Sequence, residues 1–178
     1  DFKGIHDFKG KWYHTGLWPH EGVDFTGLRV GVIGTGSSGV QMIPIIAQQA
    51  KQLTVFQRTA NFSLPARNGP MTPDREDPHK ANYKERRAAA METPFAIGGH
   101  PKPTQKTMEA TPEERAKTYE AKWQAGGSIS YLYSYTDLLV SKEANDTASE
   151  FARNKIRSIV KDKRTGELLA PKDPPIGT

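Results

Sequence analysis

Two short apolar runs set the first pattern in this chain. Residues 29–33 read Arg-Val-Gly-Val-Ile, and residues 53–57 read Leu-Thr-Val-Phe-Gln. Short runs rich in β-branched and aromatic residues predict buried parallel strands. Between them, apolar residues recur at helical spacing over residues 37–50. The order strand, loop, helix, strand within about 30 residues predicts the first unit of a dinucleotide-binding fold.

The pattern changes after the second predicted strand. Residues 61–73 are rich in Pro, Asn and Gly and predict a loop, and residues 74–160 alternate polar helices with loops. One helix has a clear start, because Thr111 can cap it, Pro112 suits its first position and Glu114 completes a capping box. The pair Gly126-Gly127 predicts its end.

Two further predictions concern the last third of the chain. We expect another helix to begin at Asn145 or Asp146, with inward-facing apolar side chains at Phe151, Ile156, Ile159 and Val160. The pair Thr165-Gly166 predicts a turn.

These elements predict an α/β fold, namely an incomplete Rossmann-type dinucleotide-binding unit with a helical insertion. We divide the chain into four parts: a linker at 1–27, the first part of an NADP-binding domain at 28–65, a helical insertion at 66–170 and a return loop at 171–178. Two strands do not make a stable sheet by themselves. We therefore expect chain outside this sequence to complete the sheet.

Composition and charge exclude several classes of function. The formal net charge is +5, but cations and anions alternate, as in Lys84-Glu85-Arg86-Arg87. Without aromatic residues interleaved among the cations, nucleic-acid binding is not predicted. The chain has no run of eighteen apolar residues, so no membrane span is predicted. The start at Asp1 shows no signal peptide.

The side chains that could bind metals or form disulfides are few. The chain has no cysteine, which excludes disulfides and cysteine-ligated metals and fits a cytoplasmic protein. His79 and His100 lack metal-ligand spacing, so we expect no metal. Ser63, Ser128 and Asp137 form no recognisable catalytic triad.

A glycine-rich segment follows the first strand directly. It matches the pattern G-x-G-x-x-G and reads Gly34-Thr35-Gly36-Ser37-Ser38-Gly39. Gly34 allows a tight turn, and Gly36 lets the backbone approach a pyrophosphate closely. Gly39 lets the helix pack closely on the strand. The helix N-terminus offers N–H groups to phosphates, and Thr35, Ser37 and Ser38 can add hydroxyl donors. The alternative is a glycine-rich turn that binds no ligand.

The end of the second strand predicts which dinucleotide binds. NAD-specific proteins have a carboxylate there for the ribose 2′-OH, whereas this chain has Gln57-Arg58-Thr59. Arg58 offers a planar, permanently charged group to a 2′-phosphate, and Thr59 offers a hydroxyl. We therefore predict NADPH, with Gln41 as a further cofactor-binding residue. The alternative for Arg58 is a surface ion pair.

The segment before the first strand carries a specific motif. Residues 8–19 read Phe-Lys-Gly-Lys-Trp-Tyr-His-Thr-Gly-Leu-Trp-Pro. This resembles the fingerprint F-x-G-x-x-x-H-x-x-x-W-[P/D] of Baeyer–Villiger monooxygenases, and every specified position matches: Phe8, Gly10, His14, Trp18 and Pro19. Residues 57–62, 145–147, 171–173 and 175–177 also look like this family. The chain resembles the branch that contains phenylacetone, cyclohexanone and steroid monooxygenases.

The resemblance implies an enzyme that uses NADPH and FAD to insert one oxygen atom of O2 into a ketone, giving an ester or lactone. It implies that FAD is bound mainly by another part of the parent chain, because the family has two glycine motifs and this sequence has one. The family's active-site Arg, and a Lys that helps to hold the 2′-phosphate, follow the Pro-Ile-Gly segment beyond Thr178. We therefore expect the FAD domain, a ketone and O2 as partners, and we assign no catalytic residue within this chain apart from the open alternative at His14.

Alternatives stay open for the function and for the linker. Flavin monooxygenases that oxidise nitrogen or sulfur have a similar linker without its Trp-Pro or Trp-Asp ending, so Trp18-Pro19 favours the Baeyer–Villiger group. By itself, the chain could be a non-catalytic NADP-binding module. His14 either takes part in catalysis or bonds to backbone while Trp18 packs an interdomain seam. The family suggests that the linker couples domain movement to the active site.

Overall fold

The structure is a computed structural model, and it describes residues 2–93, 96, 98, 100–173 and 175–177. Residues 174 and 178 of the predicted return loop, residue 1 of the linker and residues 94, 95, 97 and 99 of the predicted insertion lie outside the described residues. The chain forms two compact units, residues 1–59 and residues 60–178. Each unit is described by itself.

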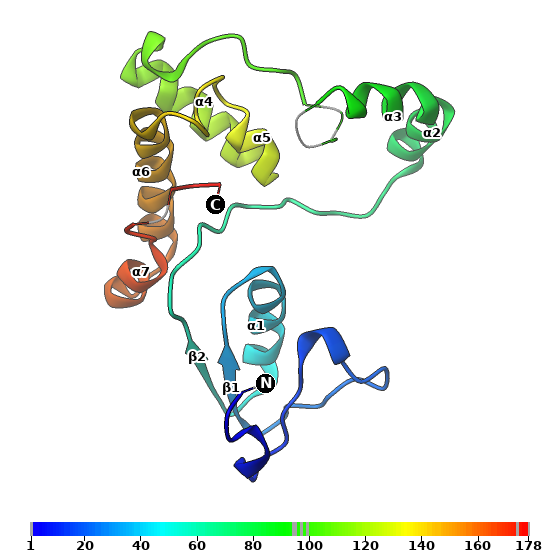
Figure 1. Cartoon of the computed structure of the whole chain (residues 1–178), viewed down its shortest axis with the longest axis vertical. Coiled ribbons are helices and arrows are strands. Elements are labelled where there is room, and N and C mark those ends of the chain that lie inside the picture. Colours follow the sequence, from blue (N-terminus) through cyan, green and yellow to red (C-terminus); the bar gives the residue numbers. More distant parts are fainter. Residues whose placement is uncertain (1, 94–95, 97, 99, 174, 178) are drawn as a thin grey trace. The chain divides into compact units, whose positions relative to one another are not determined.

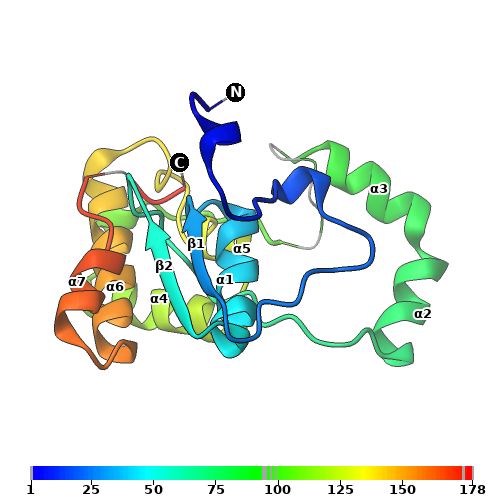
Figure 2. The ribbon, with the colours of Figure 1, turned by 90° about the horizontal axis from the view of Figure 1, so that it is seen from below.

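The first unit holds a small parallel sheet with one helix beside it (Figures 1 and 2). Strand β1 spans Arg29–Ile33, helix α1 spans Ser37–Gln49 and strand β2 spans Gln52–Phe56. The strands pair in parallel, with Val30 opposite Leu53. The predicted strands, their parallel pairing and the helix between them are confirmed. The chain is thus a mixed α/β protein.

A compact apolar cluster joins α1 to the sheet. Phe25, Val32 and Ile46 are buried in it, and partly buried side chains surround them. Within the described residues the sheet has two strands, and Ile33 and Phe56 at their carboxyl ends are 77% and 57% exposed. Completion of the sheet by further chain stays a prediction.

The described residues before β1 contain two short 3-10 helices, η1 at Ile5–Asp7 and η2 at Thr15–Leu17. The rest of the segment has an irregular, extended path. This agrees with the absence of helical periodicity in the sequence.

The second unit is helical. Its helices are α2 (Pro73–Ala81), α3 (Tyr83–Met91), η3 (Thr107–Glu109), α4 (Pro112–Ala125), α5 (Ser128–Leu132), α6 (Lys142–Ile159) and α7 (Lys163–Leu169). The described part of residues 74–160 contains no strand, so the predicted helical character of this region is confirmed.

Helix α4 begins and ends as its sequence predicts. The Thr111 hydroxyl accepts a hydrogen bond from the Glu114 N–H, and the Glu114 carboxylate accepts one from the Thr111 N–H. This is the capping box, which satisfies backbone donors that the helix itself leaves free. The helix ends at Gly126, whose φ of +81° favours glycine.

The predicted start of α6 is wrong by three to four residues. Ser141 caps the helix, because its hydroxyl accepts a hydrogen bond from the Ala144 N–H. Asn145 is inside the helix and buried, where its side chain bonds to backbone elsewhere in the unit. An Asn can cap a helix, but a buried Asn whose side chain has these other partners does not have that role here.

Two other predictions in this region are also corrected. Ile159 is 62% exposed rather than inward-facing, since the buried face of α6 consists of small residues that include Ala148 and Ala152. Phe151, in contrast, packs against the core as expected. The predicted turn at Thr165-Gly166 is part of α7, because the Asp162 carboxylate caps the Thr165 N–H and starts a helix there.

The core of the second unit is aromatic. It is built from α4, α5, α6 and the segments that follow them, which lie together in Figure 1. Its large buried side chains are Tyr119, Trp123, Tyr131, Tyr135, Leu138 and Ile176. The Tyr131 hydroxyl donates to the Ala148 carbonyl, and burial raises the pKa of Tyr131 well above its usual range. Tyr131 therefore acts as a neutral structural donor.

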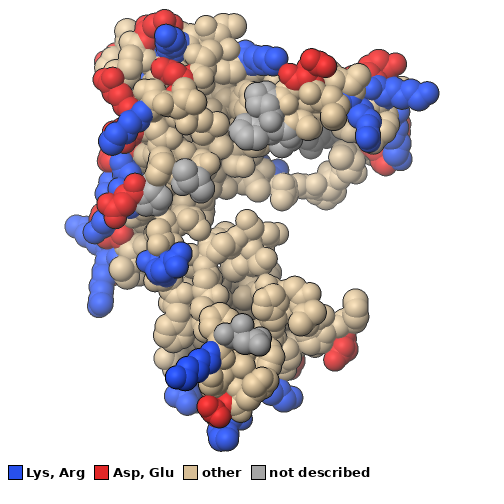
Figure 3. Space-filling view, in the orientation of Figure 1, with Lys and Arg blue, Asp and Glu red and all other residues tan. Residues whose placement is uncertain are grey.

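Charged side chains of both signs are interspersed over the helices on the face shown in Figure 3. Several form ion pairs along α6, such as Arg157 with Glu150 and Glu167. This mixture matches the alternating charges of the sequence. Among the described residues, no helix combines the length and the apolar character needed to cross a membrane.

Candidate functional site

The glycine-rich segment forms the turn between β1 and α1. Gly34 has a φ of +96°, a conformation that favours glycine because it has no Cβ. The Gly34 N–H donates to the Phe56 carbonyl at 2.9 Å, so the turn begins at the end of the paired strands. The first glycine therefore allows the tight turn that the motif predicts.

Gly39, in the first turn of α1, lies against the backbone of Gly34. A Cβ at Gly39 would be 2.6 Å from the Gly34 carbonyl oxygen, closer than real Cβ atoms approach. A Cβ at Gly36 would meet no atom within 4 Å. Gly39 is thus required by packing within the unit, while Gly36 faces open space. This is the division of roles that the motif predicts.

An open pocket lies over this turn. Its lining residues come from the linker, the end of β1, the glycine loop and the start of α1: Thr15, Ile33, Gly34, Gly36, Ser37, Ser38, Gly39 and Met42. Among the described residues, the lining has three hydroxyls and no carboxylate. The N-terminus of a 13-residue helix opens onto the pocket, and its partial positive charge favours an anion. The pocket can thus accept an anionic group at neutral pH.

Two predicted site residues, Thr35 and Gln41, form hydrogen bonds beside this pocket and do not line it. The Thr35 hydroxyl donates to the Gln57 side-chain carbonyl at 3.0 Å, which ties the glycine loop to the end of β2. The Gln41 side chain donates to the Ser37 carbonyl at 2.9 Å, one turn earlier on α1. Their roles as direct cofactor contacts stay predictions.

Arg58 and Thr59 are the second and third residues after the end of β2, and both are exposed. Neither lines the pocket over the glycine loop. Within the described part of the chain, the Arg58 guanidinium forms neither an ion pair nor a hydrogen bond. Its assignment to the 2′-phosphate and the alternative of a surface ion pair both stay predictions.

Three residues of the linker fingerprint, His14, Trp18 and Pro19, make contacts within the first unit. The His14 Nδ1 accepts a hydrogen bond from the Gly16 N–H at 3.1 Å and so caps η2. Trp18 packs its ring against Phe25, with ring centroids 6.1 Å apart. The Pro19 carbonyl accepts from the Gly22 N–H. These contacts agree with a structural role for His14 and Trp18.

Phe8 and Gly10 are both exposed and lie against each other. A Cβ at Gly10 would be 2.7 Å from the Phe8 ring. Phe8 itself is 63% exposed. The contact explains why a glycine follows Phe8 at this spacing, but it assigns neither residue a chemical role.

Sequence reasoning missed Thr15, Ile33 and Met42 as lining residues. Thr15 stands beside His14 in the fingerprint, so the motif was a signal for it. Its place over the glycine loop depends on how the linker folds back, which spacing in the sequence does not give. Ile33 and Met42 read as ordinary apolar positions of a strand and a helix.

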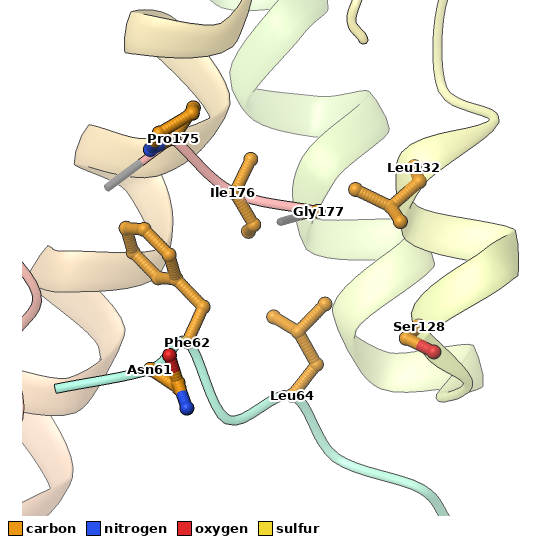
Figure 4. Close-up of a pocket in the computed structure, with 8 residues that line it drawn as sticks. All are labelled: Asn61, Phe62, Leu64, Ser128, Leu132, Pro175, Ile176 and Gly177. Carbon is orange, nitrogen blue, oxygen red and sulfur yellow. The ribbon is translucent and has the colours of Figure 1, made fainter. Parts of the chain in front are cut away.

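The second unit has a pocket of its own, shown in Figure 4. Phe62, Leu64, Leu132 and Ile176 surround it, with further contributions from Asn61, Ser128, Pro175 and Gly177. None of these lining side chains titrates near neutral pH, so the pocket offers no acid–base chemistry. The segments around residues 61–64 and 175–177, far apart in sequence, lie side by side around it.

One carboxyl group of the first unit has a shifted pKa. Hydrogen bonds from the side chain and the backbone N–H of Thr26 lower the pKa of Asp24. The group is fully exposed and lies outside the pocket. It belongs to the turn before β1 and not to the candidate site.

Comparison with known proteins gives consistent matches. Residues 1–68 match the family described as flavin-binding monooxygenase-like. The chain is 44% identical over 173 residues to a Baeyer–Villiger monooxygenase of Pseudooceanicola batsensis, and this match covers 97% of this chain and 31% of that protein. A phenazine N-monooxygenase of Lysobacter antibioticus is 37% identical over 171 residues, covering 96% of this chain and 31% of that protein.

Solved structures match over the whole chain. An oxidised steroid monooxygenase bound to NADP is 49% identical, with a TM-score of 0.88 over 99% of this chain and 34% of that chain. A crystal structure of OTEMO in complex with FAD and NADP is 42% identical, with a TM-score of 0.92 and the same coverage. The chain is therefore homologous to one part of Baeyer–Villiger monooxygenases, and it spans about a third of the length of these relatives.

Proposed function

We propose that this chain is the NADPH-binding segment of an FAD-dependent Baeyer–Villiger monooxygenase, which inserts one oxygen atom of O2 into ketones to give esters or lactones. In this proposal residues 1–27 are an interdomain linker and residues 28–65 begin a Rossmann-type NADP domain. Residues 66–170 are its helical insertion, and residues 171–178 return to it. The observation that carries the proposal is the glycine loop between β1 and α1, next to the parallel strand β2, with Arg58 two residues after β2 ends.

The residues around the loop fit a dinucleotide. A Cβ at Gly36 would project into free space over the turn, where the backbone can approach a pyrophosphate. Ser37 and Ser38 offer hydroxyls, and α1 offers N–H groups with a partial positive charge. Arg58 and Thr59 would hold the 2′-phosphate, since a planar guanidinium pairs well with phosphate oxygens.

The contribution of this chain is binding and orientation rather than bond chemistry. When bound, NADPH supplies a hydride and FAD carries the oxygen chemistry, which protein side chains do not provide. The residues of this chain hold the pyrophosphate and the 2′-phosphate and so fix one end of the dinucleotide. The FAD domain, the ketone and O2 are the partners that the proposal requires.

A heteroatom-oxidising monooxygenase is the second candidate, because one relative is a phenazine N-monooxygenase. Trp18-Pro19 at the end of the fingerprint favours the Baeyer–Villiger reaction. The products separate the two: the full-length protein should convert cyclic ketones into lactones. Formation of N-oxides from tertiary amines, with ketones left unchanged, would favour the second candidate.

The substitution Arg58→Ala tests the NADPH assignment. A hydrogen-bonded Arg–phosphate pair contributes about 1.5–3 kcal/mol, or about 10- to 150-fold in affinity. In the full-length protein, we expect Arg58→Ala to raise the Kd for NADPH by about this factor, at its lower end if a downstream Lys shares the phosphate. The Kd for NADH should hardly change, because NADH has no 2′-phosphate. Calorimetric titration with both dinucleotides measures this.

The matched control is Arg29→Ala, which removes an Arg at the opposite end of the same sheet. It should leave both Kd values unchanged. Equal weakening of NADPH and NADH by Arg58→Ala would contradict the assignment, since Arg58 would then act on the fold or on the shared pyrophosphate.

A further inference from the structure

We propose that Thr15 is a further cofactor-binding residue at the phosphate pocket and that His14 is the positioning residue that places it there. This rests on the proposed function, because the ligand is the pyrophosphate of a dinucleotide. It gives two residues of the linker motif a defined role. His14 acts through the backbone of η2 and not by transferring protons.

Thr15 is the residue through which the linker reaches the pocket. It lines the same space as the three glycines of the loop and the hydroxyls of Ser37 and Ser38. Within the described residues, the Thr15 hydroxyl makes no hydrogen bond. It is therefore available to donate to a ligand oxygen.

The backbone at Thr15 is held by the residue before it. Thr15 begins η2, and His14 caps this short helix by accepting the Gly16 N–H on its Nδ1. The Leu17 N–H donates to the His14 carbonyl, which closes the same turn. A Cβ at Gly16 would be 3.2 Å from the His14 Nδ1, so a side chain at this position would crowd the ring.

Aromatic contacts fix η2 to the body that carries the glycine loop. Trp18 follows η2 and packs against Phe25, and Tyr13 before η2 contacts both rings. Phe25 is buried in the cluster that contains Val32 of β1 and Ile46 of α1. The residues on both sides of Thr15 are thus anchored to the two elements that the glycine loop connects.

The chemistry of the pocket selects an anionic oxygen as the ligand group. The described residues that line it offer hydroxyl donors and backbone N–H groups, and none of them is a carboxylate that would repel an anion. Hydroxyl donors bond more strongly to charged acceptors than to neutral ones. A pyrophosphate oxygen is the group that a dinucleotide would present above the glycine loop.

The first experiment replaces Thr15 in the full-length protein and measures Kd by calorimetry. We expect Thr15→Ala to weaken NADPH and NADH equally, by about 10-fold, because both carry the pyrophosphate. Thr15→Ser keeps the hydroxyl and should restore most of the affinity. Thr26→Ala, a matched change outside the pocket, should leave both Kd values unchanged. Unchanged Kd values for Thr15→Ala would overturn the assignment.

The second experiment separates positioning from acid–base chemistry at His14. An Asn side chain can accept the N–H of the second residue after it, as His14 does, but it does not titrate. We therefore expect His14→Ala to weaken both dinucleotides by about as much as Thr15→Ala, and His14→Asn to restore the affinity. A His14→Asn variant as weak as His14→Ala would overturn the positioning role.

A reference variant keeps this proposal distinct from the proposed function. Gly36→Val would place a side chain in the pocket and should abolish binding of both dinucleotides. If Gly36→Val has no effect, the glycine loop does not bind a dinucleotide and the proposed function itself fails. If Gly36→Val abolishes binding while Thr15→Ala does not change it, only the Thr15 assignment is overturned.

Discussion

Replacing Gly39 by alanine is expected to destabilise the first unit and to remove most of its affinity for NADPH. Two effects of this change oppose each other. Alanine is a better helix former than glycine by about 0.8–1.0 kcal/mol. However, the added Cβ would be 2.6 Å from the Gly34 carbonyl oxygen, and that neighbour is backbone that cannot rotate away. Overpacking costs about 1–3 kcal/mol or more, so the steric effect wins.

The loss of affinity follows from where the strain falls. The atom that the new Cβ would displace belongs to Gly34, which has a φ of +96° and forms the turn over which the pocket lies. Shifting this turn moves the N–H groups that would face the phosphates. We expect the Kd for NADPH to rise by about 100-fold or more, the equivalent of about 2.7 kcal/mol. Thermal unfolding and calorimetric titration of the full-length protein measure the two effects.

Gly36→Ala is the matched control for this prediction. A Cβ at Gly36 meets no atom of the described chain, so the thermal stability should stay near that of the unsubstituted protein. Its affinity for NADPH should nevertheless fall, because the methyl group stands where the cofactor approaches. An increase in melting temperature for Gly39→Ala would mean that helix propensity dominates and that the close approach is relieved at little cost.

Replacing Asn145 by alanine is expected to destabilise the second unit by about 3–5 kcal/mol. Asn145 is 6% exposed. Its Nδ2 donates to the carbonyls of Leu138 and Ile176 at 3.1 and 2.9 Å. Its Oδ1 accepts from the Ile176 N–H at 3.0 Å and from the Ser149 hydroxyl at 3.0 Å. Removal of one side chain would leave four groups without these partners.

The stability loss expected for Asn145→Ala is large because its hydrogen-bond partners are buried. A buried polar group that loses its partner costs about 1–3 kcal/mol, although such costs do not add fully. Ser149→Ala is the control, since it removes one of the four hydrogen bonds and leaves both bonds to Ile176 intact. It should cost about 1 kcal/mol. Thermal unfolding compares the variants, and hydrogen exchange at the Ile176 N–H tests the local effect. Equal losses for both variants would show that the bonds to Ile176 contribute little.

Local signals in the sequence predicted the elements whose formation depends on neighbouring residues. The strands β1 and β2 were predicted from apolar runs, and α1 from helical spacing between them. The start of α4 at Thr111 followed from a capping box, and its end from Gly126. The turn at Gly34 and the close packing at Gly39 also follow from local signals, as the φ of Gly34 and the close approach at Gly39 show.

The tertiary structure decided what depends on contacts between distant residues. Asn145 looks like a helix cap in sequence, but it is buried because Ile176, 31 positions later, offers its backbone as partner. Ile159 looks like a core residue, but the fully buried positions of α6 end at Ala152, and Ile159 at the end of the helix is exposed. Thr15 lines the pocket over the glycine loop because Trp18 and Tyr13 pack on Phe25, which turns the linker back over that loop. Periodicity and caps are properties of short stretches of chain, whereas burial and pocket lining depend on which distant segments fold against each other.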